Sequence, residues 1–155
     1  MKKLIIGCVL VVVLLVMGTI IGPELVFSIS SPIVESECRM FADNTVLAVA
    51  KNWDSRELIN RVDPEMLRPG DEEELENLFR LYRKLGNLVE YYGAEGEIWR
   101  DSSASGAVGF SYLAEADFEN GFATVKIEGT HKDGNSYILE FNIRSEAFID
   151  GLIDH

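Results

Sequence analysis

An uncharged stretch near the N-terminus, Leu4 to Gly22, constrains the fold more than any other feature of the sequence. Its nineteen residues, LIIGCVLVVVLLVMGTIIG, follow directly on two lysines. A helix of this length spans roughly 28 Å, close to the ~30 Å hydrocarbon thickness of a bilayer. The sequence therefore predicts a membrane anchor and its exit over residues 1–30, followed by a single folded domain over residues 31–155.

Three other interpretations of this stretch exist. A cleaved signal peptide would use Ser28-Ile29-Ser30 as its small-residue site, but its apolar region is usually only about 7 to 15 residues long. A lipoprotein would use Ile5-Ile6-Gly7-Cys8, but only Leu4 separates that motif from the lysines. A buried core helix does not suit a segment that is apolar all round and flanked by lysine. The retained anchor is favoured, and cleavage stays open.

The flanking charges predict the orientation of the anchor. Lys2 and Lys3 resist translocation and keep the N-terminus in the cytoplasm. The C-terminal domain then lies on the other side of the membrane. For a bacterial chain, which the MKK opening indicates, this is the inner membrane with the domain in the periplasm.

The charge of the outer domain limits its possible partners, and its cysteine content limits its possible disulfides. All 26 acidic residues, but not Lys2 and Lys3, lie beyond the predicted anchor, so the outer domain is strongly negative. Such a surface repels phosphate backbones, which excludes nucleic acid as a partner. Cys38 is the only cysteine in the outer domain, so no internal disulfide can form there. It lies on an apolar helical stripe and is expected to be a buried structural thiol.

The first part of the outer domain has helical periodicity. Apolar residues recur at steps of three and four up to a helix end near Asn52, namely Val34, Cys38, Phe41, Ala42, Val46, Val49 and Trp53. Asp54 is the expected N-cap of a helix over Ser55–Val62, with Glu57 completing a capping box. Asp71 with Glu74 predicts the same start for a third helix that stops at Gly86. Met66 and Leu67 lie in the turn between them as apolar fillers.

After Gly86 the period changes to alternation, which predicts strands. The first runs over Leu88–Arg100, with Gly93 and Gly96 as candidate bulges. Two turns, a type I′ turn at Asn120-Gly121 and another at Asp133-Gly134, separate three further strands. Their inward sets are Val108 to Ala116, Ala123 to Gly129, and Tyr137, Leu139, Phe141 and Ile143. The predicted fold class is α+β: a transmembrane helix, then three helices on a curved antiparallel sheet of about four strands.

This order of elements, with Asn52-Trp53-Asp54 at the end of the first long helix, resembles an NTF2-like domain of the cystatin-like α+β type. The resemblance covers about Val34 to Glu146. More narrowly, the chain is similar to small bacterial proteins that carry one N-terminal membrane helix and such a domain outside. A weaker resemblance is to single-span assembly factors of respiratory complexes. This architecture hosts isomerases, dehydratases and purely binding domains, so it does not by itself give a function.

An enzyme of this family would resemble an apolar cone that contains a carboxylate or histidine base and a tyrosine donor. The alternation of the strands predicts that three glutamates lie on the face opposite the inward apolar residues, namely Glu115, Glu128 and Glu140. The polar candidates on the inner parity, taken as ligand-binding residues, are Tyr112, Tyr137 and His131, the last expected to be exposed at a turn. No catalytic residue, metal site or cofactor is predicted, because nucleophile, phosphate-loop and metal-ligand motifs are not found.

Two hypotheses follow from this pattern. The first is a membrane-anchored, extracytoplasmic binding module without catalytic activity, which binds a protein partner or pairs as a homodimer and could assist an envelope protein complex. The alternative is a small-molecule-binding or enzymatic cone that acts on an apolar ligand. The scarcity of converging polar groups on the inner parity favours the first.

Overall fold

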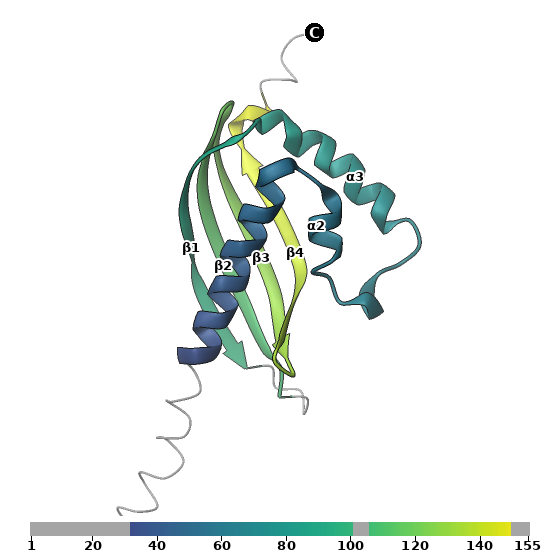
Figure 1. Cartoon of the computed structure of the whole chain (residues 1–155), viewed down its shortest axis with the longest axis vertical. Coiled ribbons are helices and arrows are strands. Elements are labelled where there is room, and N and C mark those ends of the chain that lie inside the picture. Colours follow the sequence, from purple (N-terminus) through teal and green to yellow (C-terminus); the bar gives the residue numbers. More distant parts are fainter. Residues whose placement is uncertain (1–31, 101–105, 150–155) are drawn as a thin grey trace, which may run out of the picture. The chain divides into compact units, whose positions relative to one another are not determined.

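A computed structural model describes residues 32–100 and 106–149 of the chain (Figure 1). A long N-terminal helix, described over residues 32–52, is followed by α2 (Ser55–Ile59), the 3₁₀ turn η1 (Pro64–Met66), α3 (Asp71–Tyr82) and η2 (Arg83–Leu85). The strands β1 (Leu88–Arg100), β2 (Val108–Phe118), β3 (Gly121–Lys132) and β4 (Asn135–Ser145) come next, and the 3₁₀ turn η3 (Glu146–Phe148) follows them. The chain divides into two units, Met1–Ser36 and Glu37–His155, and the second contains the whole sheet.

The expected fold class is corrected in its helical part. The α+β class and the four-stranded antiparallel sheet are confirmed, with strand order β1-β2-β3-β4. Within the described ranges there are three α-helices, and none is long and apolar enough to cross a membrane. From Glu37 on, the N-terminal helix is amphipathic and packs on the sheet. Residues 4–22, for which the transmembrane helix was expected, lie outside these ranges, so the membrane localisation stays a prediction.

The N-terminal helix has the predicted apolar face. Its buried residues recur at helical spacing and are Cys38, Ala42, Thr45, Val46, Val49 and Ala50. The Thr45 hydroxyl donates to the Phe41 carbonyl within the same helix, at 2.7 Å. This face packs on the sheet, where the rings of Phe41 and Phe110 meet edge to face with centroids 6.0 Å apart. A buried hydroxyl therefore causes no penalty here, because its hydrogen bond is made within the helix.

Trp53 ends the N-terminal helix and fixes the next change of direction. Its backbone N–H still bonds to the Val49 carbonyl at 2.9 Å, but its φ of 49° is left-handed. A bulky residue rarely adopts this conformation, so the surroundings must compensate. The indole is buried and its Nε1 donates to the Gly86 carbonyl at 2.7 Å. The Asn52-Trp53-Asp54 pattern thus marks a helix end that is tied to the start of β1.

The two shorter helices differ slightly from their predicted bounds. Asp54 caps α2 as predicted, accepting from the Arg56 backbone N–H, but α2 ends at Ile59 because Val62 pairs with Ile138 of β4 instead of continuing the helix. The predicted cap of α3 is wrong: Gly70, with φ of 101°, occupies the N-cap.

The Asp71 carboxylate accepts from the Arg68 N–H at 2.8 Å, so this side chain turns back toward the preceding loop. The α-helix itself ends at Tyr82, and the 3₁₀ turn η2 continues the helical run to Gly86, whose φ of 77° ends it at the predicted residue.

The two hairpins were predicted with different success. Asp133 and Gly134 both have positive φ, as a type I′ turn requires, and join Lys132 to its partner Asn135. The other predicted turn type is wrong. Phe118 pairs with Gly121, so the two loop residues are Glu119 and Asn120. The position of that hairpin in the chain is nevertheless as predicted.

Irregular pairing bends both outer strands. Gly93, with φ of 96°, lies at a register shift of β1, which confirms the bulge predicted there. Gly96 is not a bulge but a point of close approach. A Cβ at this position would lie 2.8 Å from the Tyr112 ring and 1.9 Å from the Ser111 carbonyl oxygen. Glycine is therefore required at Gly96 for packing, not for its backbone angles.

The hydrophobic core lies between the helices and one face of the sheet. On that face, called the inner face, the fully buried residues alternate along β2 and β3 and include Phe110, Tyr112, Ala114, Ala116, Ala123, Val125 and Ile127. The opposite, outer face carries the charged residues of these strands, including Glu115, Glu128 and Glu140 as predicted. Figure 1 shows the N-terminal helix crossing the sheet, with α2 and α3 beside β4.

Candidate functional site

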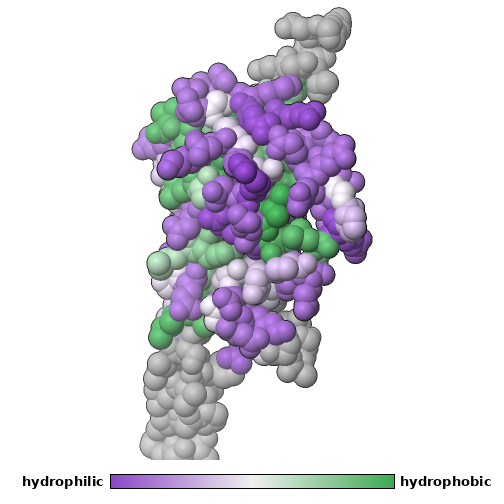
Figure 2. Space-filling model, turned by 45° about the vertical axis from the view of Figure 1, so that its right-hand side comes forward, coloured by the Kyte–Doolittle hydropathy of each residue, from purple (hydrophilic) through white to green (hydrophobic). Residues whose placement is uncertain are grey.

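A groove lined almost wholly by apolar side chains lies between α2, η1, α3 and β4. We call it the β4 groove. Its volume is about 270 Å³, and it is lined by Leu58, Ile59, Val62, Met66, Leu67, Asp71, Leu75, Ile138, Leu139 and Phe141. The space-filling view, which brings the α2–α3 side forward, shows hydrophobic residues exposed among hydrophilic ones (Figure 2). Asp71 is the only charged residue in this lining.

The groove exposes large apolar side chains to water. Met66 is 53% exposed and Leu139 is 51% exposed, and Leu67 is also exposed. Covering a Leu or Met side chain contributes about 1.5–3 kcal/mol. These three residues therefore form a surface that gains free energy when another group covers it.

Local sequence explains why the groove stays open. Pro64 starts the short turn η1, and Pro69 and Gly70 break the chain before α3, so Met66 and Leu67 lie in a connection without a long helix of their own. On the opposite wall, β4 has a register shift between the Glu128 and Gly129 pairings, which leaves Leu139 unpaired. The bulge places Leu139 at the groove.

Neighbouring segments already cover parts of the free edge of β4. The Ile138 N–H donates to the Arg61 carbonyl at 2.8 Å. Burial raises the pKa of the Tyr82 hydroxyl, and a hydrogen bond with the Ile143 backbone opposes that shift. The groove therefore opens between two covered points of the strand, at Ile138 and Ile143.

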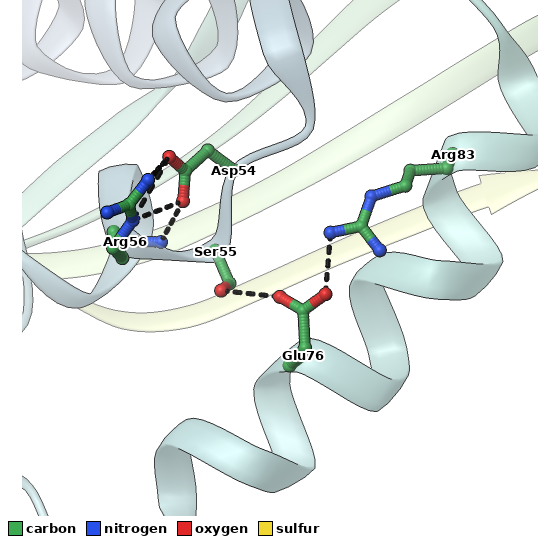
Figure 3. Close-up of polar contacts among 5 residues, drawn as sticks. All are labelled: Asp54, Ser55, Arg56, Glu76 and Arg83. Carbon is green, nitrogen blue, oxygen red and sulfur yellow. Dashed lines mark hydrogen bonds and ion pairs between the residues drawn. The ribbon is translucent and has the colours of Figure 1, made fainter.

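A polar network holds α2 against α3 and so sets the width of the groove (Figure 3). The buried Ser55 hydroxyl donates to Glu76 Oε2 at 2.9 Å, and Arg83 donates to Glu76 Oε1 at 2.6 Å. Hydrogen bonds from Arg83 and then Ser55 lower the pKa of Glu76. At the start of α2, Asp54 forms an ion pair with Arg56 at 2.7 Å. These contacts are structural, since each carboxylate faces a partner from its own domain.

The structure does not bring together the three predicted ligand-binding residues. Tyr112 lies on the inner face, fully buried, with its ring 5.9 Å from that of Phe110. Tyr137 pairs with Thr130 and therefore lies on the outer face. The predicted face of Tyr137 is wrong because the bulge at Leu139 shifts the inward–outward alternation by one residue for the part of β4 that precedes it. Neither tyrosine lines the β4 groove.

His131 is corrected from an exposed turn residue to a largely covered strand residue. Its side chain is 12% exposed, Nδ1 lies 2.9 Å from the Ser136 hydroxyl and Nε2 lies 3.6 Å from Glu37. Burial and then the charge of Glu37 raise the pKa of the neighbouring Cys38 thiol to about 11, against a hydrogen bond to Ser136. This confirms Cys38 as a buried thiol that stays protonated at neutral pH. The cluster ties the N-terminal helix to the β3–β4 hairpin.

Asp43 and Tyr91 form a pair that the sequence did not predict. Asp43 lies in the N-terminal helix and Tyr91 in β1, and the Tyr91 hydroxyl donates to Asp43 Oδ1 at 2.6 Å. The same oxygen accepts from the backbone N–H of Ala94 at 2.9 Å. The only sequence signal was the irregularity introduced by Gly93, which places this N–H beside a bulge.

A second cavity, of about 680 Å³, lies at the β2–β3 turn. It is lined by Asn120, Gly121, Phe122, Arg144, Ser145, Glu146, Ala147 and Ile149. Two of its polar side chains are used by the fold, since Asn120 donates to the Lys84 carbonyl and Ser145 to the Phe122 carbonyl. Within the described residues no group of three or more His, Cys, Asp or Glu side chains is arranged to hold a metal ion. The β4 groove is thus the better candidate.

Comparison with known proteins gives no relative for this chain. No family model, no curated protein and no solved structure matches it. The geometry of the β4 groove is therefore the basis for assigning a function.

Proposed function

We propose that this protein is a non-catalytic binding module and that the β4 groove takes up apolar side chains of a protein partner. The observation that carries the proposal is the exposure of Met66, Leu67 and Leu139 around one groove. Their exposure costs free energy in the free chain, and a partner that covers them recovers it.

The size of the groove supports a protein partner over a whole small molecule. Its volume of about 270 Å³ is just below the ~300–1,000 Å³ typical of sites that enclose a drug-sized ligand. The alternative, a cone for an apolar ligand, has less support, because Tyr112 and Tyr137 lie on opposite faces of the sheet. The inner residues that would line such a cone are packed against one another. The antiparallel α+β architecture is compatible with an NTF2-like domain. We include this family assignment in the proposal.

Site-specific crosslinking tests the proposal. A photoreactive phenylalanine replaces Leu139 in the full chain, expressed in a bacterial host, and replaces the exposed Glu95 of β1 in a matched control. We expect a discrete heavier species on illumination only for the Leu139 position, and its loss when Met66→Glu is added. Met66 is exposed, so this second substitution leaves the fold intact.

Two results would count against the proposal. One is equal crosslinking at Leu139 and Glu95, which would indicate random collision. The other is a small-molecule adduct, detected by native mass spectrometry of the intact protein, that disappears on Met66→Glu; that result would favour the small-ligand alternative.

A further inference from the structure

The β4 groove contains one carboxylate in an otherwise apolar lining, and this restricts what can cover it. Asp71 lines the groove, and its Oδ2 accepts from the Arg68 N–H at 2.8 Å. A purely apolar occupant would remove water from this carboxylate without replacing its interactions, which is costly. An occupant that supplies a cationic donor avoids that cost.

The surroundings of Asp71 are also acidic. Glu72, Glu73 and Glu74 follow it in the first turn of α3 and are exposed. Two cations adjoin lining residues in the sequence: Arg61, next to Val62, is engaged by Glu57 at 2.9 Å, and Arg68, next to Leu67, is exposed. The whole chain has a formal net charge of −12. A segment that carries positive charge is therefore attracted to this side of the molecule and held there.

The covered edge of β4 limits how a peptide can bind. Ile138 already bonds to the Arg61 carbonyl, and the Ile143 backbone bonds to Tyr82. A partner cannot add a strand along this edge without displacing both contacts, so insertion of side chains is the compatible mode. A groove of about 270 Å³ takes a few side chains at most.

We infer that the occupant of the β4 groove is a short protein segment in which one or two bulky apolar residues stand next to a lysine or arginine that pairs with Asp71. This inference rests on the proposed function and adds the chemistry of the partner. The apolar residues supply affinity by covering Met66, Leu67 and Leu139, and the cation supplies selection against acidic or uncharged segments.

A random peptide library displayed on phage, selected against the full-length protein, tests the inference. We expect enriched peptides to combine bulky apolar residues with lysine or arginine and to lose binding to the Met66→Glu variant. Asp71→Asn keeps an oxygen that can accept from Arg68, so it removes the charge and preserves the loop. It should weaken a selected peptide about fivefold, the size of a partly exposed ion pair, and flatten its salt dependence.

A control and two contrary results complete the test. Asp63→Asn, which changes an acidic residue outside the groove lining, should leave affinity unchanged. Peptides that need Met66 but show no enrichment of basic residues and bind Asp71→Asn equally well would overturn the inference and leave the proposed function standing. A selection that yields no peptide sensitive to Met66→Glu would overturn both.

Discussion

The hydroxyl of Tyr91 donates a 2.6 Å hydrogen bond to the carboxylate of Asp43, across the interface between β1 and the N-terminal helix. The same carboxylate oxygen accepts from the N–H of Ala94, the residue after the bulge at Gly93. One side chain thus satisfies a phenol and a backbone donor in a partly buried place. The pair fixes the bent part of β1 to the helix.

Removing the Asp43 carboxylate should lower the free energy of unfolding more than removing the Tyr91 hydroxyl. Asp43→Ala leaves both donors without their partner, and we expect a loss of about 2–3 kcal/mol in the free energy of unfolding. Tyr91→Phe removes only one hydrogen bond, and about 1 kcal/mol is expected. Urea unfolding measures both. Tyr92→Phe is the matched control, since that tyrosine is 51% exposed and should change stability by less than about 0.5 kcal/mol. Equal effects at Tyr91 and Tyr92 would contradict the structure.

Alanine at two glycines should separate packing from backbone strain. Gly96→Ala places a Cβ 1.9 Å from the Ser111 carbonyl oxygen, so we expect a loss of about 3 kcal/mol or more. Gly134→Ala meets no atom within 4 Å, but its φ of 76° costs alanine about 1–2 kcal/mol. Thermal unfolding of the two variants ranks them. Finding Gly134→Ala to be the more damaging would indicate that β1 and β2 are not as close as described.

The Cys38 thiol should be unreactive in the folded protein. In a Cys8→Ser background, a disulfide reagent should label Cys38 roughly a hundredfold more slowly at pH 8 than after denaturation. Because folding raises the pKa of Cys38 from 9.0 to about 11, its contribution to stability is complete below pH 9 and is lost as the pH rises toward 11. Replacing Cys38 with alanine should therefore make stability fall less steeply over that interval. Rapid labelling without denaturant would refute its burial.

At acid pH the Glu76 network should be one of several sensitive elements, beside the carboxyl groups of Asp54, Glu119 and Glu128, whose pKa values are also lowered. Hydrogen bonds from Arg83 and Ser55 lower the pKa of Glu76 in the folded state, so its contribution is present above the ordinary glutamate range and is lost as the pH falls through the lowered value. Glu76→Gln should make stability less dependent on pH below about pH 5. Glu95→Gln, at an exposed site in β1, should leave the profile of urea midpoints against pH unchanged. Identical profiles for the wild type and Glu76→Gln would contradict this role.

The exposed residues of the groove should matter little to folding. Met66→Gln should change stability by less than about 0.5 kcal/mol, because the side chain is already 53% exposed. Leu85→Ala, at the fully buried last position of η2, should cost about 2–5 kcal/mol. Chemical denaturation gives both values. A large loss on Met66→Gln would mean that Met66 belongs to the core and not to a binding surface.

The sequence predicted those features of the fold that depend on local periodicity. The buried stripe of the N-terminal helix, the Asp54 cap, the stop at Gly86 and the Asp133-Gly134 turn are each determined within a few residues. The face on which each residue of β4 lies could not be predicted in this way, because the bulge opposite Glu128 and Gly129 depends on pairing with another strand. Alternation alone therefore placed Tyr137 on the wrong face.

The candidate site was harder to predict than the fold. Its walls come from α2, η1, α3 and β4, so residues more than sixty positions apart, such as Leu67 and Leu139, meet only after folding. In the sequence, Met66 and Leu67 have the character of turn fillers. Two large apolar residues in a short connection were the available signal, and their exposure could be known only from the structure.

The hydrogen bond between the Trp53 indole and the Gly86 carbonyl joins two left-handed residues that are 33 positions apart. It closes the base of the segment that contains α2, η1 and α3, and the hydrogen bond from the Ile138 N–H to the Arg61 carbonyl fastens the same segment to β4. Substitutions at exposed positions of this segment, such as Met66 and Leu67, can then alter the walls of the groove while the buried Phe79 keeps the segment packed on the core. The binding specificity of the groove can therefore be redesigned through the exposed side chains of one closed loop, without changing the residues that hold the fold together.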